Sequence, residues 1–119
     1  MYDVKLDAAD KPTLYRDLAA ALEGLVHGEP DPIANMANAA ALIWDNVPGL
    51  NWAGFYRNIC GELVLGPFQG RPACIRIPFG KGVCGAAAQS LKVQRIDDVN
   101  AFSGHIACDA ASVSELVVP

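Results

Sequence analysis

The sequence lacks long hydrophobic runs and lacks an excess of positive charge. Its longest apolar stretches, such as 39–44, are far shorter than the about 18 residues that span a bilayer. Nine Lys and Arg stand against 13 Asp and Glu, a net charge of −4. Because phosphate binding needs a cationic face, neither nucleic acid nor a membrane is expected as a partner. The first ten residues, MYDVKLDAAD, do not resemble a secretory signal, so we expect a cytoplasmic protein.

Metal-ligand spacing is also missing. The four cysteines, Cys60, Cys74, Cys84 and Cys108, form neither a CxxC pair nor a cluster with histidine, so a zinc site is not expected. Structural disulfides are rare in a reducing cytosol. Two interpretations remain for these residues, buried thiols and redox-active thiols.

What the sequence does contain is a change of pattern near residue 50. At 119 residues with 52% hydrophobic content, it predicts one domain, residues 1–119. Residues 10–29 and 31–47 have helical apolar spacing. Each begins with an aspartate and has a proline in its first turn, Pro12 and Pro32 respectively. Alternating runs and glycine turns after residue 50 predict antiparallel hairpins and one short helix, hence an α+β architecture. The predicted strands are 51–58, 63–68, 73–78, 93–96 and 114–118, and the short helix carries 86–89.

Cys84 lies within the glycine-rich sequence FGKGVCG, after Gly80 and Gly82, and opens the short helix. The turn matches neither the P-loop nor the dinucleotide-binding pattern, so Gly80 and Gly82 are interpreted as turn residues that can adopt positive φ. Free N–H groups at the start of a helix favour an anion, so a Cys84 thiolate could be stabilised there. The alternative is that Cys84 is a small buried hydrophobe.

Two more cysteines have neighbours that could tune a thiol. Cys108 follows His105 by three residues, and a short turn would let this histidine exchange a proton with the thiol. The alternative is a surface histidine beside a half-buried cysteine. Cys74 stands between Arg71 and Arg76, in cationic surroundings.

Aromatic residues and one acid suggest where a small ligand could bind. Trp52, Phe55 and Tyr56 share a predicted strand, and alternation places Trp52 and Tyr56 on the same face. They either fill the core or form the wall of a small apolar pocket. Glu115 interrupts an apolar strand and is either solvent-facing or the anion that receives a substrate cation.

Five short phrases follow one another along residues 51–119, within a resemblance that covers about residues 35–119. Together, and in this order, they resemble free methionine-(R)-sulfoxide reductases, a family built on the GAF domain. The phrases are NWAGFY at 51–56, LGPFQGRPAC at 65–74, IPFGKGVCG at 77–85, DVNAFSGHIACD at 98–109 and SELVVP at 114–119.

The resemblance implies reduction of free L-methionine (R)-sulfoxide to methionine by cysteine thiol, sulfenic acid and disulfide chemistry. It implies thioredoxin as the reductant, no metal or organic cofactor, and a homodimer as one form of the protein. Cys108 would be the nucleophile and Cys74 the resolving thiol, with Cys84 as the alternative partner. Cys60 lies outside this trio.

The same resemblance implies the substrate-binding residues. Trp52, Phe55 and Tyr56 would surround the methyl group and side chain of the substrate. Glu115 matches a family carboxylate that helps to hold the amino-acid head group.

Family members continue past VVP with a hairpin, an acidic D-x-D type segment and a closing helix. We therefore expect a GAF-like domain without its last strands and closing helix, which binds substrate poorly and is inactive or nearly so by itself. Two alternatives to the enzyme are a non-catalytic GAF module that binds a small molecule and an inactive fragment of the reductase. A sensor module has no need for three thiols in these phrases.

Overall fold

The computed structural model describes residues 2–104 and 112–119. The chain divides into two compact units, one formed by Met1–Phe55 with Gly66–Gly70 and the other by Tyr56–Leu65 with Arg71–Pro119. Its helices are α1 (Lys11–Val26), α2 (Pro32–Asn46), α3 (Gly82–Ser90) and the short 3-10 helix η1 (Val99–Ala101). Its strands are β1 (Trp52–Ile59), β2 (Glu62–Gly70), β3 (Arg76–Pro78), β4 (Gln94–Ile96) and β5 (Glu115–Val117).

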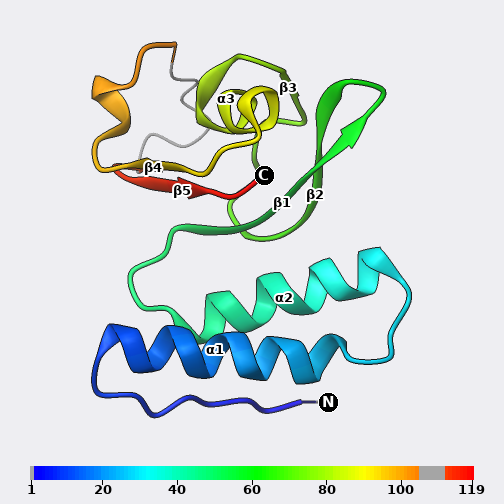
Figure 1. The fold of residues 1–119 in the computed structure, drawn as a ribbon, viewed down its shortest axis with the longest axis vertical. Helices are drawn as coiled ribbons and strands as arrows, with labels where there is room; N and C mark the ends of the chain where they lie inside the picture. The colour runs from blue at the N-terminus through cyan, green and yellow to red at the C-terminus, as the bar shows by residue number, and fades with distance from the viewer. Residues whose placement is uncertain (1, 105–111) are drawn as a thin grey trace. The chain divides into compact units, whose positions relative to one another are not determined.

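The first unit is dominated by the helices α1 and α2, which lie side by side (Figure 1). Each begins as the sequence predicts. The Asp10 carboxylate accepts a hydrogen bond from the Thr13 N–H at 2.8 Å, and the Asp31 carboxylate accepts one from the Ala34 N–H at 2.9 Å. These bonds satisfy backbone donors that a helix leaves unpaired in its first turn. The buried residues of α2 are Ala39, Ala40 and Leu42, while α1 buries no residue completely.

The first sheet has the strand order β1–β2–β3. A two-residue turn joins β1 to β2, with φ of 51° at Cys60 and 83° at Gly61, which confirms the predicted hairpin. β3 pairs antiparallel with β2, placing Ile77 opposite Leu63. The predicted strand over 73–78 is wrong at its start, because only 76–78 pair as a strand and Cys74 lies in an irregular segment before them.

In the second unit, α3 packs closely on the turn that precedes it. A Cβ atom at Gly85 would lie 2.5 Å from the Pro78 carbonyl oxygen, so only glycine allows this approach. Gly80 and Gly82 have φ of 81° and 62°, which confirms their interpretation as turn residues. The helix is longer than predicted, because it begins at Gly82 immediately after the turn.

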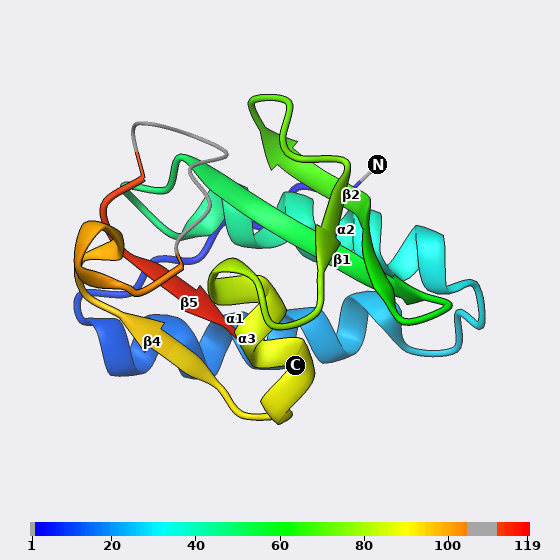
Figure 2. The same cartoon turned by 90° about the horizontal axis from the view of Figure 1, so that it is seen from above.

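A second, two-stranded sheet completes this unit. β4 and β5 run antiparallel side by side (Figure 2), with Ile96 opposite Glu115. The predicted α+β class is therefore confirmed, with helices followed by antiparallel strands. Among residues 2–104 and 112–119, no helix has both the length and the apolar character that a membrane crossing requires.

Candidate active site

Tyr56 connects β1 to the segment that carries Cys74. Its hydroxyl donates a hydrogen bond to the Cys74 backbone carbonyl at 2.6 Å, and both residues are half-buried members of the second unit. Nothing in the sequence predicts this bond, because an acceptor on the backbone has no residue-type signature and the partners are 18 residues apart.

The Cys74 segment is held at two successive carbonyl groups. Besides the bond to Cys74, the Leu65 N–H of β2 donates to the Ile75 carbonyl at 2.9 Å. The sulfur of Cys74 is engaged in a disulfide, whereas Cys60 and Cys84 carry free thiols. Cys60 is exposed in the hairpin turn. Cys74 is thus the oxidised cysteine among the three that the structure describes.

The cationic surroundings predicted for Cys74 are weaker than the sequence indicates. Arg71 and Arg76 are both exposed, and the Arg76 guanidinium pairs with the Glu62 carboxylate at 3.1 Å. Exposed charges are screened by water, and one of the two is already balanced by a carboxylate.

Cys84 lies in the first turn of α3, as predicted, but its thiol is not activated. Burial, together with the negative charge of Glu115, raises the pKa of Cys84 to about 11. The predicted stabilisation of a thiolate is therefore wrong, because desolvation of the charged form outweighs the helix N-terminus. At neutral pH Cys84 is a protonated, half-buried thiol, which is the alternative interpretation.

Glu115 interacts electrostatically with both Cys84 and Tyr56. It is the first residue of β5 and is half-buried. Burial raises the pKa of Tyr56 to about 12, and the charges of Cys84 and Glu115 add to this effect. Because Glu115 acts on both Tyr56 and Cys84, the three side chains lie within electrostatic reach of one another.

The two other predicted pocket residues belong to the first unit. The indole of Trp52 stacks on Phe68, with ring centroids 5.4 Å apart and 16° between the ring planes. A Cβ atom at Gly54 would lie 2.3 Å from Cβ of Phe68, so Gly54 leaves the space that Phe68 occupies. Phe55 is half-buried on the same strand. The role of Trp52 and Phe55 as a substrate wall stays a prediction.

The predicted nucleophile lies outside the described residues. Cys108, together with His105 and Asp109, falls in 105–111. Its position relative to Cys74 and Cys84 therefore stays a prediction as well.

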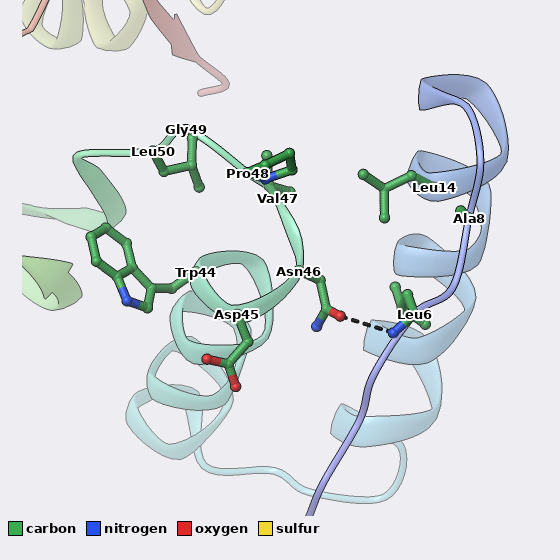
Figure 3. Close-up of a pocket in the computed structure, with 10 residues that line it drawn as sticks. All are labelled: Leu6, Ala8, Leu14, Trp44, Asp45, Asn46, Val47, Pro48, Gly49 and Leu50. Atoms are coloured by element: carbon green, nitrogen blue, oxygen red, sulfur yellow. Dashed lines mark hydrogen bonds between the residues drawn. The ribbon is translucent and has the colours of Figure 1, made fainter.

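A cavity of about 450 Å³ in the first unit has a different character (Figure 3). None of the predicted site residues lines it. At its edge, the side-chain amide of Asn46 accepts a hydrogen bond from the Leu6 N–H at 3.0 Å and donates one to the Val4 carbonyl at 3.2 Å. Asn46 thus pairs with the N-terminal segment much as a neighbouring strand would, a structural role. The lining residues are Leu6, Ala8, Leu14, Trp44, Asp45, Asn46, Val47, Pro48, Gly49 and Leu50.

Comparison with known proteins identifies relatives, although no family model matches the chain. It is 52% identical over 110 residues to the free methionine-R-sulfoxide reductase of Escherichia coli, covering 92% of this chain and 67% of that protein. The solved free methionine-R-sulfoxide reductase from Neisseria meningitidis, in complex with its substrate, superposes with a TM-score of 0.93 at 45% identity. That match covers 100% of this chain and 72% of the other.

The fold has a second close match. A solved structure described as the GAF domain superposes with a TM-score of 0.87 at 45% identity, over 93% of this chain and 67% of that one. Together with the order of helices and antiparallel strands in this chain, these similarities confirm the GAF-like α+β fold. This chain belongs to the free methionine-R-sulfoxide reductase family.

Proposed function

We propose that this chain carries the cysteine chemistry that reduces free L-methionine (R)-sulfoxide to methionine. The expectation of little or no activity by itself stays a prediction, which the test below decides. The observation that carries the proposal is the group formed by Tyr56, Cys84 and Glu115 beside the oxidised Cys74, in a member of this family. A titratable cluster of this kind, partly removed from water, is typical of a reaction site.

The first step uses Cys108 as the nucleophile. Its thiolate attacks the sulfoxide sulfur, the oxygen passes to the cysteine with one proton, and methionine leaves. The substrate sulfur gains two electrons, and Cys108 becomes a sulfenic acid. Cys84 is poorly suited to this role, because a thiol with a pKa of about 11 is almost entirely protonated at neutral pH.

The second step uses Cys74 as the resolving thiol. Its sulfur displaces hydroxide from the Cys108 sulfenic acid, forming a disulfide and releasing water. The oxidised state of Cys74 supports this assignment, since the other two described cysteines are free thiols. Thioredoxin then returns both sulfurs to thiols by dithiol exchange, which fits a reducing cytoplasm.

Glu115 is proposed to receive the ammonium group of the substrate. Its carboxylate is half-buried and, after burial, is a further cause of the raised pKa of the Cys84 thiol and the Tyr56 phenol, which supports this role. A bound ammonium group would be attracted by the same field. Trp52, Phe55 and Tyr56 are proposed to contact the apolar part of the substrate.

The test is mass spectrometry of the fully reduced protein mixed with one equivalent of L-methionine (R)-sulfoxide. Disulfide formation removes about 2 Da, and the peptide map should place the new bond between Cys74 and Cys108. Cys108→Ser should abolish both the mass loss and methionine release. The S epimer should leave the thiols unchanged.

Cys60→Ser is the matched control, because it removes an exposed thiol outside the proposed site. It should lose the same mass at the same rate as the parent. A Cys60→Ser protein that fails to oxidise would contradict the assignment. Binding of methionine sulfoxide without any change in thiol content would instead support a non-catalytic GAF module.

A further inference from the structure

We propose that Tyr56 is a positioning residue for the resolving step, because its hydroxyl holds the backbone that presents the Cys74 sulfur. The inference rests on the proposed function for the identity of Cys108 as the nucleophile. The role proposed for Tyr56 in the substrate pocket uses only its aromatic ring, whereas this second role uses its hydroxyl.

The Cys74 segment is irregular and largely exposed. Residues 71–75 form neither helix nor strand, and Arg71, Pro72 and Ile75 are all exposed. Two hydrogen bonds anchor backbone carbonyl groups of the segment within the second unit. The Tyr56 hydroxyl donates to the Cys74 carbonyl, and the backbone N–H of Leu65 in β2 donates to the Ile75 carbonyl. The first of these bonds acts on the backbone of Cys74 itself, and the second on the residue that follows it.

The anchor is built to stay a donor. At 2.6 Å it lies at the short end of O–H···O distances, and the Cys74 carbonyl is only partly accessible to water that might replace it. A tyrosine hydroxyl keeps its proton at neutral pH, and burial, followed by the electrostatic effects of Cys84 and Glu115, raises the pKa of Tyr56 further, from 10.0 to about 12. An ionised tyrosine could only accept a hydrogen bond, and the carbonyl needs a donor.

The resolving reaction depends on such an anchor. The Cys74 thiol attacks the sulfenic sulfur of Cys108, the S–S bond forms, the S–O bond breaks, and water leaves with the thiol proton. A disulfide requires the two Cα atoms to come within about 7 Å. A segment held near that geometry reacts faster than one that must search for it, because orientation is established before the reaction.

The experiment measures disulfide closure in Tyr56→Phe, which keeps the ring and removes the hydroxyl. It uses the full chain with Cys60→Ser and Cys84→Ser, so that Cys74 is the one thiol left to resolve. Reduced protein is mixed with L-methionine (R)-sulfoxide, sulfenic acid is trapped with dimedone at successive times, and free thiols are alkylated. Closure is read from sulfenic acid already formed, which separates it from any effect of the variant on substrate binding.

We expect closure to slow by about tenfold, the effect of losing one well-formed hydrogen bond, with sulfenic acid accumulating. Tyr15→Phe is the matched control, because it removes a hydroxyl from an exposed tyrosine on α1 and should close as fast as the parent. Equal closure rates in the parent and in Tyr56→Phe would overturn the inference.

A second measurement separates failure of the inference from failure of the proposed function. The Cys74 disulfide is equilibrated with reduced and oxidised glutathione, without substrate, and the fraction of disulfide is measured. Tyr56→Phe should lower the equilibrium constant for the disulfide by about tenfold, and Tyr15→Phe should not change it. If the parent releases no methionine, the proposed function fails, and the glutathione equilibrium alone decides the role of Tyr56. An unchanged constant in Tyr56→Phe refutes that role.

Discussion

Cys74 and Cys84 are ten residues apart in the second unit and are both half-buried, yet their surroundings differ in kind. Cys74 lies in an irregular segment tethered by the Tyr56 hydroxyl, and its sulfur is oxidised. Cys84 lies in the first turn of α3, a helix that packs closely on the Pro78 carbonyl oxygen at Gly85, and its thiol is free.

The difference shows that local position on an element does not decide thiol chemistry. The helix N-terminus favours a thiolate at Cys84, but burial and the charge of Glu115 oppose it and prevail. Cys74 lies outside any helix, and its backbone carbonyl accepts a hydrogen bond from the Tyr56 hydroxyl at 2.6 Å. A thiol that is to react needs access and placement more than a favourable dipole.

The largest effect should come from replacing the Cys74 sulfur with oxygen. Cys74→Ser should slow turnover with a dithiol reductant on the order of 100-fold, because an external thiol must replace one held at high effective concentration. Cys84→Ser should retain most of the activity. Steady-state methionine production measures both.

Equal losses of activity in Cys74→Ser and Cys84→Ser would contradict the assignment of Cys74 as the resolving thiol. Cys84 would then be needed for resolution despite its raised pKa. Trapping of the sulfenic acid in Cys74→Ser would identify the step that is lost.

The next effect concerns Gly85, the glycine that follows Cys84 in α3. Gly85→Ala places a methyl group 2.5 Å from the Pro78 carbonyl oxygen, so α3 must shift. We expect a loss of about 1–3 kcal/mol in the free energy of unfolding, measured by denaturant titration. As α3 moves away, the pKa of Cys84 should fall because its thiol becomes more accessible to water.

Gly24→Ala is the control for this change. Gly24 is exposed within α1, and no atom would lie within 4 Å of an added Cβ. The substitution should therefore stabilise the protein by about 0.5–1 kcal/mol, through helix propensity alone. Destabilisation by both alanines would argue against the close approach of α3 as the cause.

The smallest effect is the pH dependence of Cys84. Its pKa is raised from 9.0 to about 11, so folding disfavours the thiolate. This contribution to stability is fully present below pH 9.0 and is lost as the pH rises through about 11. In the folded protein, alkylation of Cys84 by iodoacetamide should therefore rise with a midpoint near pH 11.

Glu115→Gln sharpens this measurement. It should lower the alkylation midpoint of Cys84 but leave it above 9.0, because burial is the larger cause of the shift. Alkylation of the exposed Cys60 in the same samples is the internal control. A midpoint for Cys84 that does not move in Glu115→Gln would contradict the electrostatic contact between the two residues.

Much of the fold could be predicted because its signals are local. The aspartates and prolines that begin α1 and α2, and the Gly61 turn of the hairpin, act on atoms within a few residues. The start of β3 was predicted three residues too early. The alternation of apolar and polar residues is a property of one segment, whereas the ends of a strand depend on where the neighbouring strand pairs with it. β2 pairs with β3 only over residues 76–78.

By itself, the sequence determined the order of helices and hairpins, the family to which the chain belongs, and the choice of the cysteines and Glu115 as candidates. Only the tertiary structure decided the state of those candidates. It buried the Cys84 thiol beside a carboxylate 31 residues away in sequence, and it joined the Tyr56 hydroxyl to a backbone carbonyl. The pKa of Cys84 and the hydrogen bond of Tyr56 both depend on exclusion of water and on partners that folding brings together. Neither can be predicted from the residues adjacent along the chain.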